Sequence, residues 1–555
     1  ILHMGVFQTT VQKNGSSSSI FAEGVQRTSG KDAHRMNIVT ARLVAETIKT
    51  TLGPRGMDKM LVDSLGDVTI TNDGATILRE MDIDHPIANM MINVARTQEI
   101  AAGDGTTTAV VIAGELLKKA EELLDQRIHP TIIANGYQMA AEKSKEILDS
   151  LAMDIALDDE ETLKKIAMTT MTGKGVEKAK EHLAPIIVTA LKTVISGENG
   201  SLTVNGEQIK VAVKEGANIN ETEYFEGIVI DKEKAHHSMP QRVENARIAL
   251  INVPLDISSK EATSQIRFSD PSQLRAFAEE QKGMLQDMIS YIKNSGANVV
   301  ISTRNIDDLA QYYLAKENIM ALRRIKKSDM EKLARATGAN IIVNLEDLTE
   351  ADLGFAGIVE EVKVADDFMT IIKECRNPKA VSILIRGETK QVAEEVERAV
   401  EDCLGAVGSA LEDRKVLPGG GAVEIELSKR LQNYAKYVGG REQLAIEAFA
   451  EALEVIPTAL AENAGFDPID TLIAMKTQNE KYGFQMGLDV YDGQVKNMYN
   501  LGVIEPLRVK KVAIDSASQV TTMLLRIDDV IAAARLKKPT PDQVLAAQST
   551  NQGAQ

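Results

Sequence analysis

Apolar positions along the chain follow two different periods, and these separate its ends from its middle. From Lys31 to about Leu151 the spacing is mostly i, i+3, i+4 and i+7, as in residues 113–124, and it predicts helices. Two short strands are predicted within this stretch, at residues 59–63 and 67–71. The N-terminal part is therefore predicted to be mostly helical.

The middle of the chain alternates short runs rich in Val and Ile with helical segments. These runs predict strands at residues 227–230, 248–253, 298–301, 340–343 and 381–385. Strands that alternate with helices favour an α/β unit. Helical spacing then returns in a stripe from Val392 to Leu411 and again from Ala422 to about Ala534, with one further strand predicted at residues 509–514.

Composition narrows the class of protein. A chain of 555 residues is long enough for about three to four domains. Its formal charge of −17 disfavours a nucleic acid or an anionic membrane as a partner. Two cysteines without a C-x-x-C pair indicate a reducing compartment, and no apolar run reaches the 18 residues of a membrane span. The polar ends, residues 1–24 and 537–555, are predicted to be flexible tails.

Three glycine-containing segments are the candidates for chemistry. They are Thr51-Leu-Gly-Pro54, Asn72-Asp-Gly-Ala-Thr76 and Gly103-Asp-Gly-Thr-Thr-Thr108, the last directly before a predicted helix. Glycine lets the backbone approach a ligand closely, and the free N–H groups of a helix start favour an anion. A carboxylate at Asp104 would repel phosphate unless a divalent cation bridged them. The same residue types are also ordinary helix N-caps, so the spacing alone leaves both interpretations open.

Two common nucleotide motifs are absent. No segment matches G-x-x-x-x-G-K-[ST], and Thr108 stands where the dinucleotide fingerprint requires glycine. The sequence therefore gives little support to a P-loop kinase or a dehydrogenase.

These loops, in this order and together with Pro418-Gly-Gly-Gly-Ala422, resemble those of the chaperonins. Residues 51–62, Thr172-Gly-Lys-Gly175 and Gly502-Val-Ile-Glu-Pro506 are similar to group II members, the archaeal thermosomes and their eukaryotic cytosolic relatives. The resemblance extends from about Gly30 to Leu536. It implies a cytoplasmic, ATP-dependent chaperone that uses Mg²⁺, with K⁺ as an optional second cation.

The resemblance also implies roles for residues at matching positions. Asp402 and Asp73 would be the catalytic carboxylates, the first orienting the attacking water and the second lying near the γ-phosphate. Asp104 would bind the magnesium ion, Lys174 would sense the γ-phosphate, and Glu505 would hydrogen-bond the ribose hydroxyls. The other residues expected to contact the nucleotide are Thr51, Leu52, Gly53, Pro54, Gly74, Gly105, Thr106, Thr107, Thr108, Gly173, Gly420, Gly421 and Asp489.

Without the resemblance, three of these residues have ordinary alternatives. Asp402 lies at the margin of an apolar helical stripe, as Glu395 and Asp413 do, so periodicity does not single it out. Glu505 fits a turn before a proline, and Lys174 fits a surface loop.

The spacing of the site predicts an inserted domain. About 230 residues separate Lys174 from Asp402, so the chain must leave the site and return to it. By resemblance, residues 25–157 and 417–536 would form a mostly helical equatorial ATPase domain. Residues 158–226 and 380–416 would form a small α/β intermediate hinge domain, with hinges at 216–227 and 386–387. The predicted fold class is thus multidomain α+β.

The remaining part, residues 227–379, would be an α/β apical domain that binds non-native proteins. Its segment 256–282 matches the helical protrusion that serves group II chaperonins as a built-in lid. The apolar residues expected to contact a neighbouring lid or a substrate are Ile266, Phe268, Leu274 and Phe277. An ordinary helical hairpin packed on its own domain is the alternative.

Two other functions remain to be weighed: a small-molecule kinase and a nucleotide-binding scaffold without turnover. The sequence shows no acceptor pocket for the first, and the carboxylates Asp73 and Asp402 argue against the second. The resemblance implies two stacked rings of like or paralogous subunits, roughly sixteen or eighteen copies, whereas a kinase would form a small oligomer.

Overall fold

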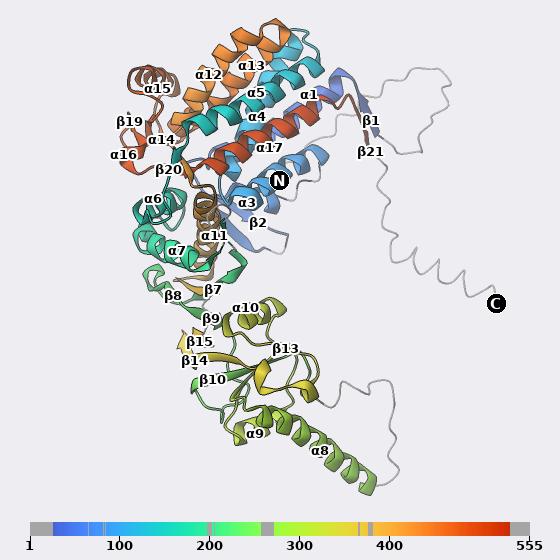
Figure 1. The fold of residues 1–555 in the computed structure, drawn as a ribbon. Helices are drawn as coiled ribbons and strands as arrows, with labels where there is room; N and C mark the ends of the chain where they lie inside the picture. Colours follow the sequence, from blue (N-terminus) through green and yellow to red (C-terminus); the bar gives the residue numbers. More distant parts are fainter. Residues whose placement is uncertain are drawn as a thin grey trace, which may run out of the picture.

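The structure is a computed structural model, and it describes residues 26–532 apart from residues 65, 82, 84, 197–201, 205, 257–270, 365–366 and 376–380. Figure 1 shows three bodies stacked along one long axis. We call them the upper body (26–154 and 417–532), the middle body (155–225 and 381–416) and the lower body (227–375). The predicted multidomain α+β fold class is confirmed, with a helical body at one end and two α/β bodies below it.

Long amphipathic helices from both ends of the chain build the upper body. One hydrophobic cluster joins residues 38–151 to residues 417–525, and its largest fully buried side chains include Tyr137 and Phe449. The two rings meet edge to face, with centroids 5.5 Å apart. The helices are α1 (Lys31–Lys49), α2 (Gly74–Glu80), α3 (Pro86–Ala102), α4 (Thr106–Asp125), α5 (Pro130–Leu151), α12 (Ala422–Val438), α13 (Gly440–Leu453), α14 (Val455–Ala464), α15 (Pro468–Tyr482), α16 (Met498–Leu501) and α17 (Leu507–Leu525).

Short antiparallel pairs complete this body. The two strands predicted at residues 59–71 are confirmed as a hairpin of β2 and β3. The pairs are β1 (Gln26–Ser29) with β21 (Asp529–Ala532), β2 (Lys59–Val62) with β3 (Val68–Thr71), and β18 (Met486–Asp489) with β19 (Gln494–Asn497). A three-stranded sheet of β20 (Ile504–Pro506), β17 (Lys415–Pro418) and β4 (Met153–Asp154) lies at the boundary with the middle body.

One predicted element is wrong. Residues 509–514 lie in the first turns of α17 and do not form a strand. The β-branched residues of the run Val509-Lys-Lys-Val-Ala-Ile514 favour a strand when the sequence is considered alone. Its buried positions are 509, 510, 513, 514 and 517, which is the spacing of a helix face, and Pro506 stands at the N-cap of the helix.

The middle body has a separate core, packed between helices and a small sheet. The strand order is β7-β16-β8, with β16 parallel to β7 and antiparallel to β8. Helix α11 crosses this sheet and carries the predicted apolar stripe. The elements are α6 (Glu160–Met171), α7 (Lys180–Val194), β5 (Ile195–Ser196), β6 (Thr203–Val204), β7 (Ile209–Glu215), β8 (Glu223–Phe225), β16 (Val381–Gly387), α11 (Lys390–Asp413) and the 3₁₀ turns at 177–179, 206–208 and 219–221.

The lower body is a mixed sheet with helices against it. The strand order is β12-β11-β10-β14-β15-β9, and β13 also pairs with β10. The predicted strands near 227, 248, 298 and 340 are confirmed. The antiparallel strands β14 and β15 were not predicted, because buried and exposed positions do not alternate regularly along them. The elements are β9 (Gly227–Ile230), β10 (Arg242–Ile251), α8 (Pro271–Ser295), β11 (Val299–Ser302), α9 (Asp308–Lys316), β12 (Met320–Leu322), α10 (Lys327–Thr337), β13 (Ile341–Ile342), β14 (Gly354–Val364), β15 (Asp367–Cys375) and the 3₁₀ turns at 345–347 and 350–352.

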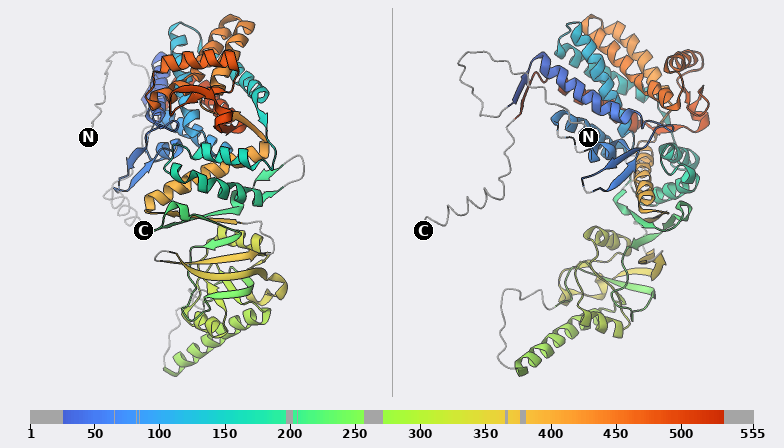
Figure 2. Two further views of the ribbon diagram at one scale, coloured as in Figure 1. Left: turned by 90° about the vertical axis from the view of Figure 1, so that its left-hand side faces the viewer. Right: turned by 180° about the vertical axis from the view of Figure 1, so that it is seen from behind.

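Helix α8 extends from the lower body at the end farthest from the upper body (Figures 1 and 2). Ile266 and Phe268 lie outside the described residues, and the side chains of Leu274 and Phe277 within α8 are likewise outside the description. The predicted lid contacts therefore remain predictions.

Candidate functional site

A cavity of about 520 Å³ opens between the upper and middle bodies. Two of its walls belong to the upper body, one from residues 51–108 and one from residues 420–510. Residues 165–180 of the middle body form the facing wall. The cavity is therefore assembled from three parts of the chain that are far apart in sequence.

The residues predicted to contact the nucleotide converge on this cavity. Asp73 and Asp104 line it as well, whereas Asp402 stands behind Lys174 and does not line it. The nucleotide contacts predicted from the sequence that line it are Thr51, Leu52, Gly53, Pro54, Gly74, Gly105, Thr106, Thr107, Thr108, Gly173, Lys174, Gly420, Gly421, Asp489 and Glu505.

The loop before α4 turns sharply because two glycines adopt left-handed backbone angles. Gly103 (φ 75°) ends α3, and Gly105 (φ 84°) is the N-cap of α4, where no side chain caps the helix. A Cβ atom at Gly105 would lie 2.8 Å from Val509 Cγ1 and 2.9 Å from Gln98 Nε2. The first N–H groups of a 20-residue helix are thus brought to the cavity wall, where they attract an anion.

Two carboxylates at this loop are held by nearby backbone amides and a hydroxyl. Asp73 accepts from the Thr76 amide at 2.7 Å through Oδ2 and from the Thr106 hydroxyl at 3.1 Å through Oδ1. Asp104 accepts from the Gly105 amide at 2.7 Å through Oδ1. Among the described residues nothing donates to its Oδ2, which is free to bind a cation.

Lys174 and Asp402 form an ion pair at the middle-body wall. Lys174 Nζ lies 2.5 Å from Asp402 Oδ2, and the two side chains are 14% and 15% exposed. Burial raises the pKa of Asp402 to about 8, although Lys174 opposes the rise. Burial by itself lowers the pKa of Lys174, but Asp402 and Asp104 outweigh it and keep the ammonium charged. Lys174 is thus placed between a buried carboxylate and the cavity.

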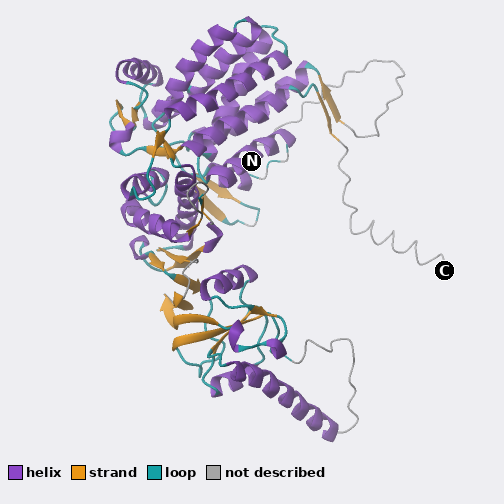
Figure 3. Ribbon diagram, viewed as in Figure 1, coloured by secondary structure: helices purple, strands orange, loops and turns teal. Residues whose placement is uncertain are grey.

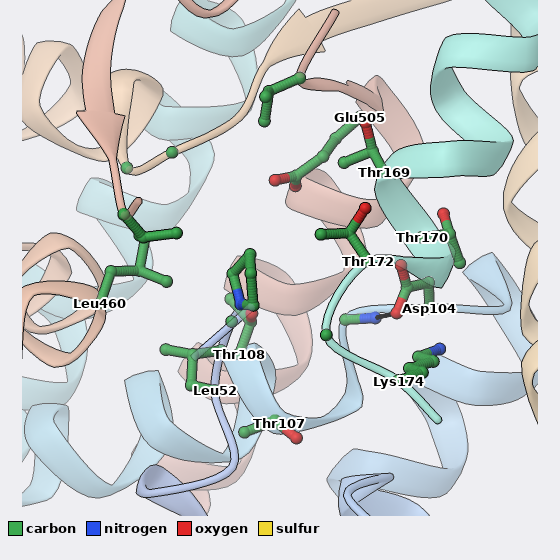
Figure 4. Close-up of a pocket in the computed structure, with 18 of the residues that line it drawn as sticks. Leu52, Asp104, Thr107, Thr108, Thr169, Thr170, Thr172, Lys174, Leu460 and Glu505 are labelled. Carbon is green, nitrogen blue, oxygen red and sulfur yellow. Dashed lines mark hydrogen bonds between the residues drawn. The ribbon is translucent and has the colours of Figure 1, made fainter. Parts of the chain in front are cut away.

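The opposite end of the cavity is apolar. Gly420 and Gly421 have positive φ angles, and their backbone passes close to Met498 and Pro457, respectively. Figure 4 shows Leu52 and Leu460 on the side of the cavity away from Asp104 and Lys174. The apolar side chains that line the cavity as a whole are Leu52, Met168, Ile456, Leu460, Leu488, Val490, Met498, Leu501, Val503 and Val509. The cavity therefore has one charged end and one end suited to a flat ring.

Several lining residues were not predicted from the sequence. Thr169 accepts from the Ile504 amide at 3.3 Å and donates to the Gly502 carbonyl at 3.2 Å, so it ties α6 to the strand β20 that carries Glu505. Thr170 adjoins the quoted Thr172-Gly-Lys-Gly motif, which could have pointed to it. The segment around Lys510 was predicted as a strand, so the place of Lys510 on the buried face of a helix was missed. The polar side chains that line the cavity without having been assigned a ligand contact are Asn72, Lys165, Thr169, Thr170, Thr172, Lys180, Tyr491 and Lys510.

Over the residues that the structure describes, no group of three or more His, Cys, Asp and Glu side chains is placed to hold a metal ion by itself. No helix in the described part of the chain is both long and apolar enough to cross a membrane.

Known proteins match this chain over nearly its whole length. The family model of the TCP-1/cpn60 chaperonin family matches residues 44–535. This chain belongs to the TCP-1/cpn60 chaperonin family. A thermosome subunit of Methanopyrus kandleri is 58% identical to this chaperonin over 525 residues, which cover 95% of this chain and 96% of the relative. A thermosome subunit of Pyrococcus horikoshii is 58% identical over 527 residues, with the same coverage.

A solved structure also resembles this chaperonin. The open-state monomer of a group II chaperonin from Methanococcoides burtonii is 46% identical to it, with a TM-score of 0.59, and the match covers 76% of this chain and 100% of that one. The predicted resemblance to group II chaperonins and archaeal thermosome subunits is confirmed. The chain is an ATP-dependent chaperonin subunit that forms ring assemblies, and it hydrolyses ATP in support of protein folding. The kinase and scaffold alternatives are therefore excluded.

Proposed function

We propose that the cavity binds ATP with its triphosphate at the start of α4 and its adenosine at the apolar end. The N-terminus of α4 would contact the phosphates, since it presents free N–H groups to the cavity, and residues 51–54 would line the nucleotide from below. Gly420, Gly421 and Asp489 would border the base and ribose, and Glu505 would accept from the ribose hydroxyls.

The charges at the phosphate end require a cation. Asp73 and Asp104 line this end of the cavity, and Lys174 is already paired with Asp402 before any phosphate enters. A Mg²⁺ ion held by Asp104 Oδ2 and phosphate oxygens would balance this negative charge, as magnesium sites use one or two carboxylates. The ion would neutralise developing charge on the phosphate oxygens. A K⁺ ion remains an optional second cation.

We assign the hydrolytic step to Asp402, and the observation that carries this assignment is its pairing with Lys174 at the edge of the cavity. A carboxylate whose pKa is raised toward neutrality is suited to take a proton from water. Lys174 would turn from Asp402 to the γ-phosphate when ATP binds, which frees Asp402 to orient the attacking water. Asp73 would hold the phosphate end from the opposite wall.

Replacement of Asp402 tests this assignment. We expect Asp402→Ala to slow ATP hydrolysis by about 10²- to 10⁴-fold while ADP affinity changes little, because the carboxylate does not line the cavity. Glu401→Ala is the matched control, since Glu401 is the adjacent carboxylate on α11 and is exposed. Normal hydrolysis by Asp402→Ala would contradict the assignment.

Domain rotation would couple this chemistry to closure of the chamber. We propose the equatorial domain at 25–157 and 417–536, the intermediate domain at 158–226 and 380–416, and the apical domain at 227–379. The separate hydrophobic clusters of the upper, middle and lower bodies support this division. Gly216 donates to the Gly387 carbonyl at 2.8 Å, so the two proposed hinge segments lie side by side.

The assembly that we propose is two stacked rings of like or paralogous subunits that enclose non-native proteins, with residues 256–282 as the lid. A cytoplasmic location is part of the proposal, since both cysteines are buried free thiols. Negative-stain microscopy of the purified protein tests the assembly: two stacked rings support it, and single rings or small oligomers contradict it. Trypsin cleavage of residues 256–282 that is unchanged by ATP with a transition-state mimic would contradict the lid.

A further inference from the structure

A lysine and two glutamates form a buried triad at the ribose end of the cavity. Lys510 Nζ lies 2.7 Å from Glu424 Oε1 and 2.8 Å from Glu505 Oε2. The side chains of Lys510 and Glu424 are 7% and 3% exposed, whereas that of Glu505 is 25% exposed. Lys510 and Glu505 line the cavity, and Glu424 lies behind them on α12.

Lys510 occupies a position that a helix does not favour for a cation. It lies in the first turn of α17, where the N–H groups present a partial positive charge. Burial by itself lowers the pKa of Lys510, but Glu424 and Glu505 together outweigh burial and raise it. The ammonium is therefore kept at this place by the two carboxylates and not by the helix.

The two glutamates differ in how they are satisfied. Glu424 Oε2 is buried and has no hydrogen-bond partner in the described part of the chain, so this residue serves Lys510 alone. Glu505 binds Lys510 through Oε2, and no described group donates to its Oε1. A Cβ atom at Gly419 would lie 2.8 Å from that Oε1, so glycine leaves it room. Figure 4 shows the Glu505 carboxylate projecting into the cavity.

We propose that Lys510, anchored by Glu424, is the positioning residue for ribose recognition: it holds Glu505 as an oriented, ionised acceptor for the sugar hydroxyls. The inference rests on the proposed contact of Glu505 with ribose and adds the device that makes the contact selective. An ionised carboxylate accepts from both hydroxyls, whereas a protonated one loses part of that capacity. Burial raises the pKa of Glu505 and Lys510 opposes the rise, which agrees with this role.

Binding of ADP and of 2′,3′-dideoxyADP to the assembled protein, measured by calorimetry, tests the proposal. The wild type is expected to prefer ADP by about 10- to 100-fold, since hydroxyls bound to a charged acceptor contribute that much. In Lys510→Met we expect ADP to bind about tenfold or more weakly and dideoxyADP nearly as before, so that the preference falls to about onefold to threefold. A preference equal to that of the wild type would overturn the proposal.

Lys511→Met is the matched control. Lys511 is the next residue of α17, and it pairs at 2.6 Å with Asp149 on α5 at the surface. The preference for ADP should be unchanged in this variant. Lys510→Arg, which keeps the charge, should retain part of the preference.

Two further variants keep the test decisive. If Lys510→Met does not assemble because Glu424 is left buried without a partner, Lys510→Met/Glu424→Gln removes both charges and is measured instead; a wild-type preference there overturns the proposal. Glu505→Gln distinguishes the proposed ribose contact of Glu505 from the proposed role of Lys510. If this variant keeps the full preference, the ribose contact of Glu505 itself is wrong; if it loses the preference and Lys510→Met keeps it, only the role of Lys510 is wrong.

Discussion

The wall that the upper body contributes to the cavity and the wall that the middle body contributes differ in what their charged groups bind. Asp73 and Asp104 are each held by an amide of their own loop, and Asp73 also by the Thr106 hydroxyl of the neighbouring loop. Lys174 and Asp402 are held by each other, across 228 positions of sequence. The first arrangement is complete before a ligand arrives, whereas the second must exchange partners when a phosphate attracts Lys174. One wall is thus preorganised and the other is a switch.

The largest change in ADP affinity is expected from a change to the preorganised wall. Gly105→Ala places a Cβ atom against Val509 and Gln98 in a left-handed conformation, so the loop must move. We expect ADP affinity to fall by about 100-fold or more, roughly 3 kcal/mol. Calorimetry measures this. Gly439→Ala is the control, because Gly439 has φ 67° and open space around it, so it carries the strain without the clash. Equal effects of the two substitutions would show that strain alone is responsible.

A change to the switching wall should affect hydrolysis more than binding. Lys174→Met removes the partner of Asp402 and the proposed contact to the γ-phosphate. We expect the rate of ATP hydrolysis to fall by about 10- to 100-fold, with ADP affinity within about threefold of the wild type. Single-turnover hydrolysis and ADP calorimetry measure the two quantities. A loss confined to ADP affinity would show that Lys174 belongs to the preorganised wall instead.

The pH dependence of hydrolysis should report on Asp402. Its pKa is raised to about 8, and only the ionised form accepts a proton, so activity is lost as pH falls through that value. We expect kcat/KM to fall by about 15-fold between pH 8 and pH 6.5. In Lys174→Met the opposing attraction is gone, so the midpoint should move to higher pH. A profile that is the same in both proteins would exclude Asp402 as its source.

The smallest effect is expected from removal of the helix cap that Asp73 provides for α2. Asp73→Ala removes the acceptor of the Thr76 amide, and loss of such a cap costs about 1 kcal/mol. Hydrogen exchange at the start of α2 should become about fivefold faster, and hydrolysis should slow as well. Asp467→Ala removes the equivalent cap of α15, so it should loosen that helix without slowing hydrolysis. Unchanged hydrolysis in Asp73→Ala would show that Asp73 only caps α2 and takes no part in hydrolysis.

The sequence was sufficient for the parts of the site that form local motifs. The loop at residues 103–108 contains its glycines, carboxylate and threonines within six residues, and the loops at 51–54 and 72–76 are equally short. Asp402 required the family resemblance, because its helical phase matches that of Glu395 and Asp413. What distinguishes Asp402 is the short distance between its carboxylate and the Lys174 ammonium in the structure.

Most of the residues that escaped prediction lie singly on regular helices. Gln98 on α3 is fully buried and donates to the Asp104 carbonyl at 2.6 Å and to the Val509 carbonyl at 3.0 Å, so it supports the phosphate loop from behind. Nothing in its sequence neighbourhood marks it. One feature of the sequence pointed to Lys510: if the segment is helical, Lys510 falls on its apolar face. The β-branched residues around it favoured a strand instead. Such contacts depend on how distant helices pack, and a single sequence does not contain that information.

The division of the upper body between the two ends of the chain has a consequence for its own synthesis. Helices α4 and α5 pack against α13 and α17, and the ribosome begins the first of these only after residues 152–439. At about 5–20 residues per second, those roughly 290 residues take on the order of 15 to 60 s. For that time the apolar faces of α4 and α5 lack their partners. Every new subunit thus passes through an aggregation-prone stage of the kind that the finished ring exists to manage.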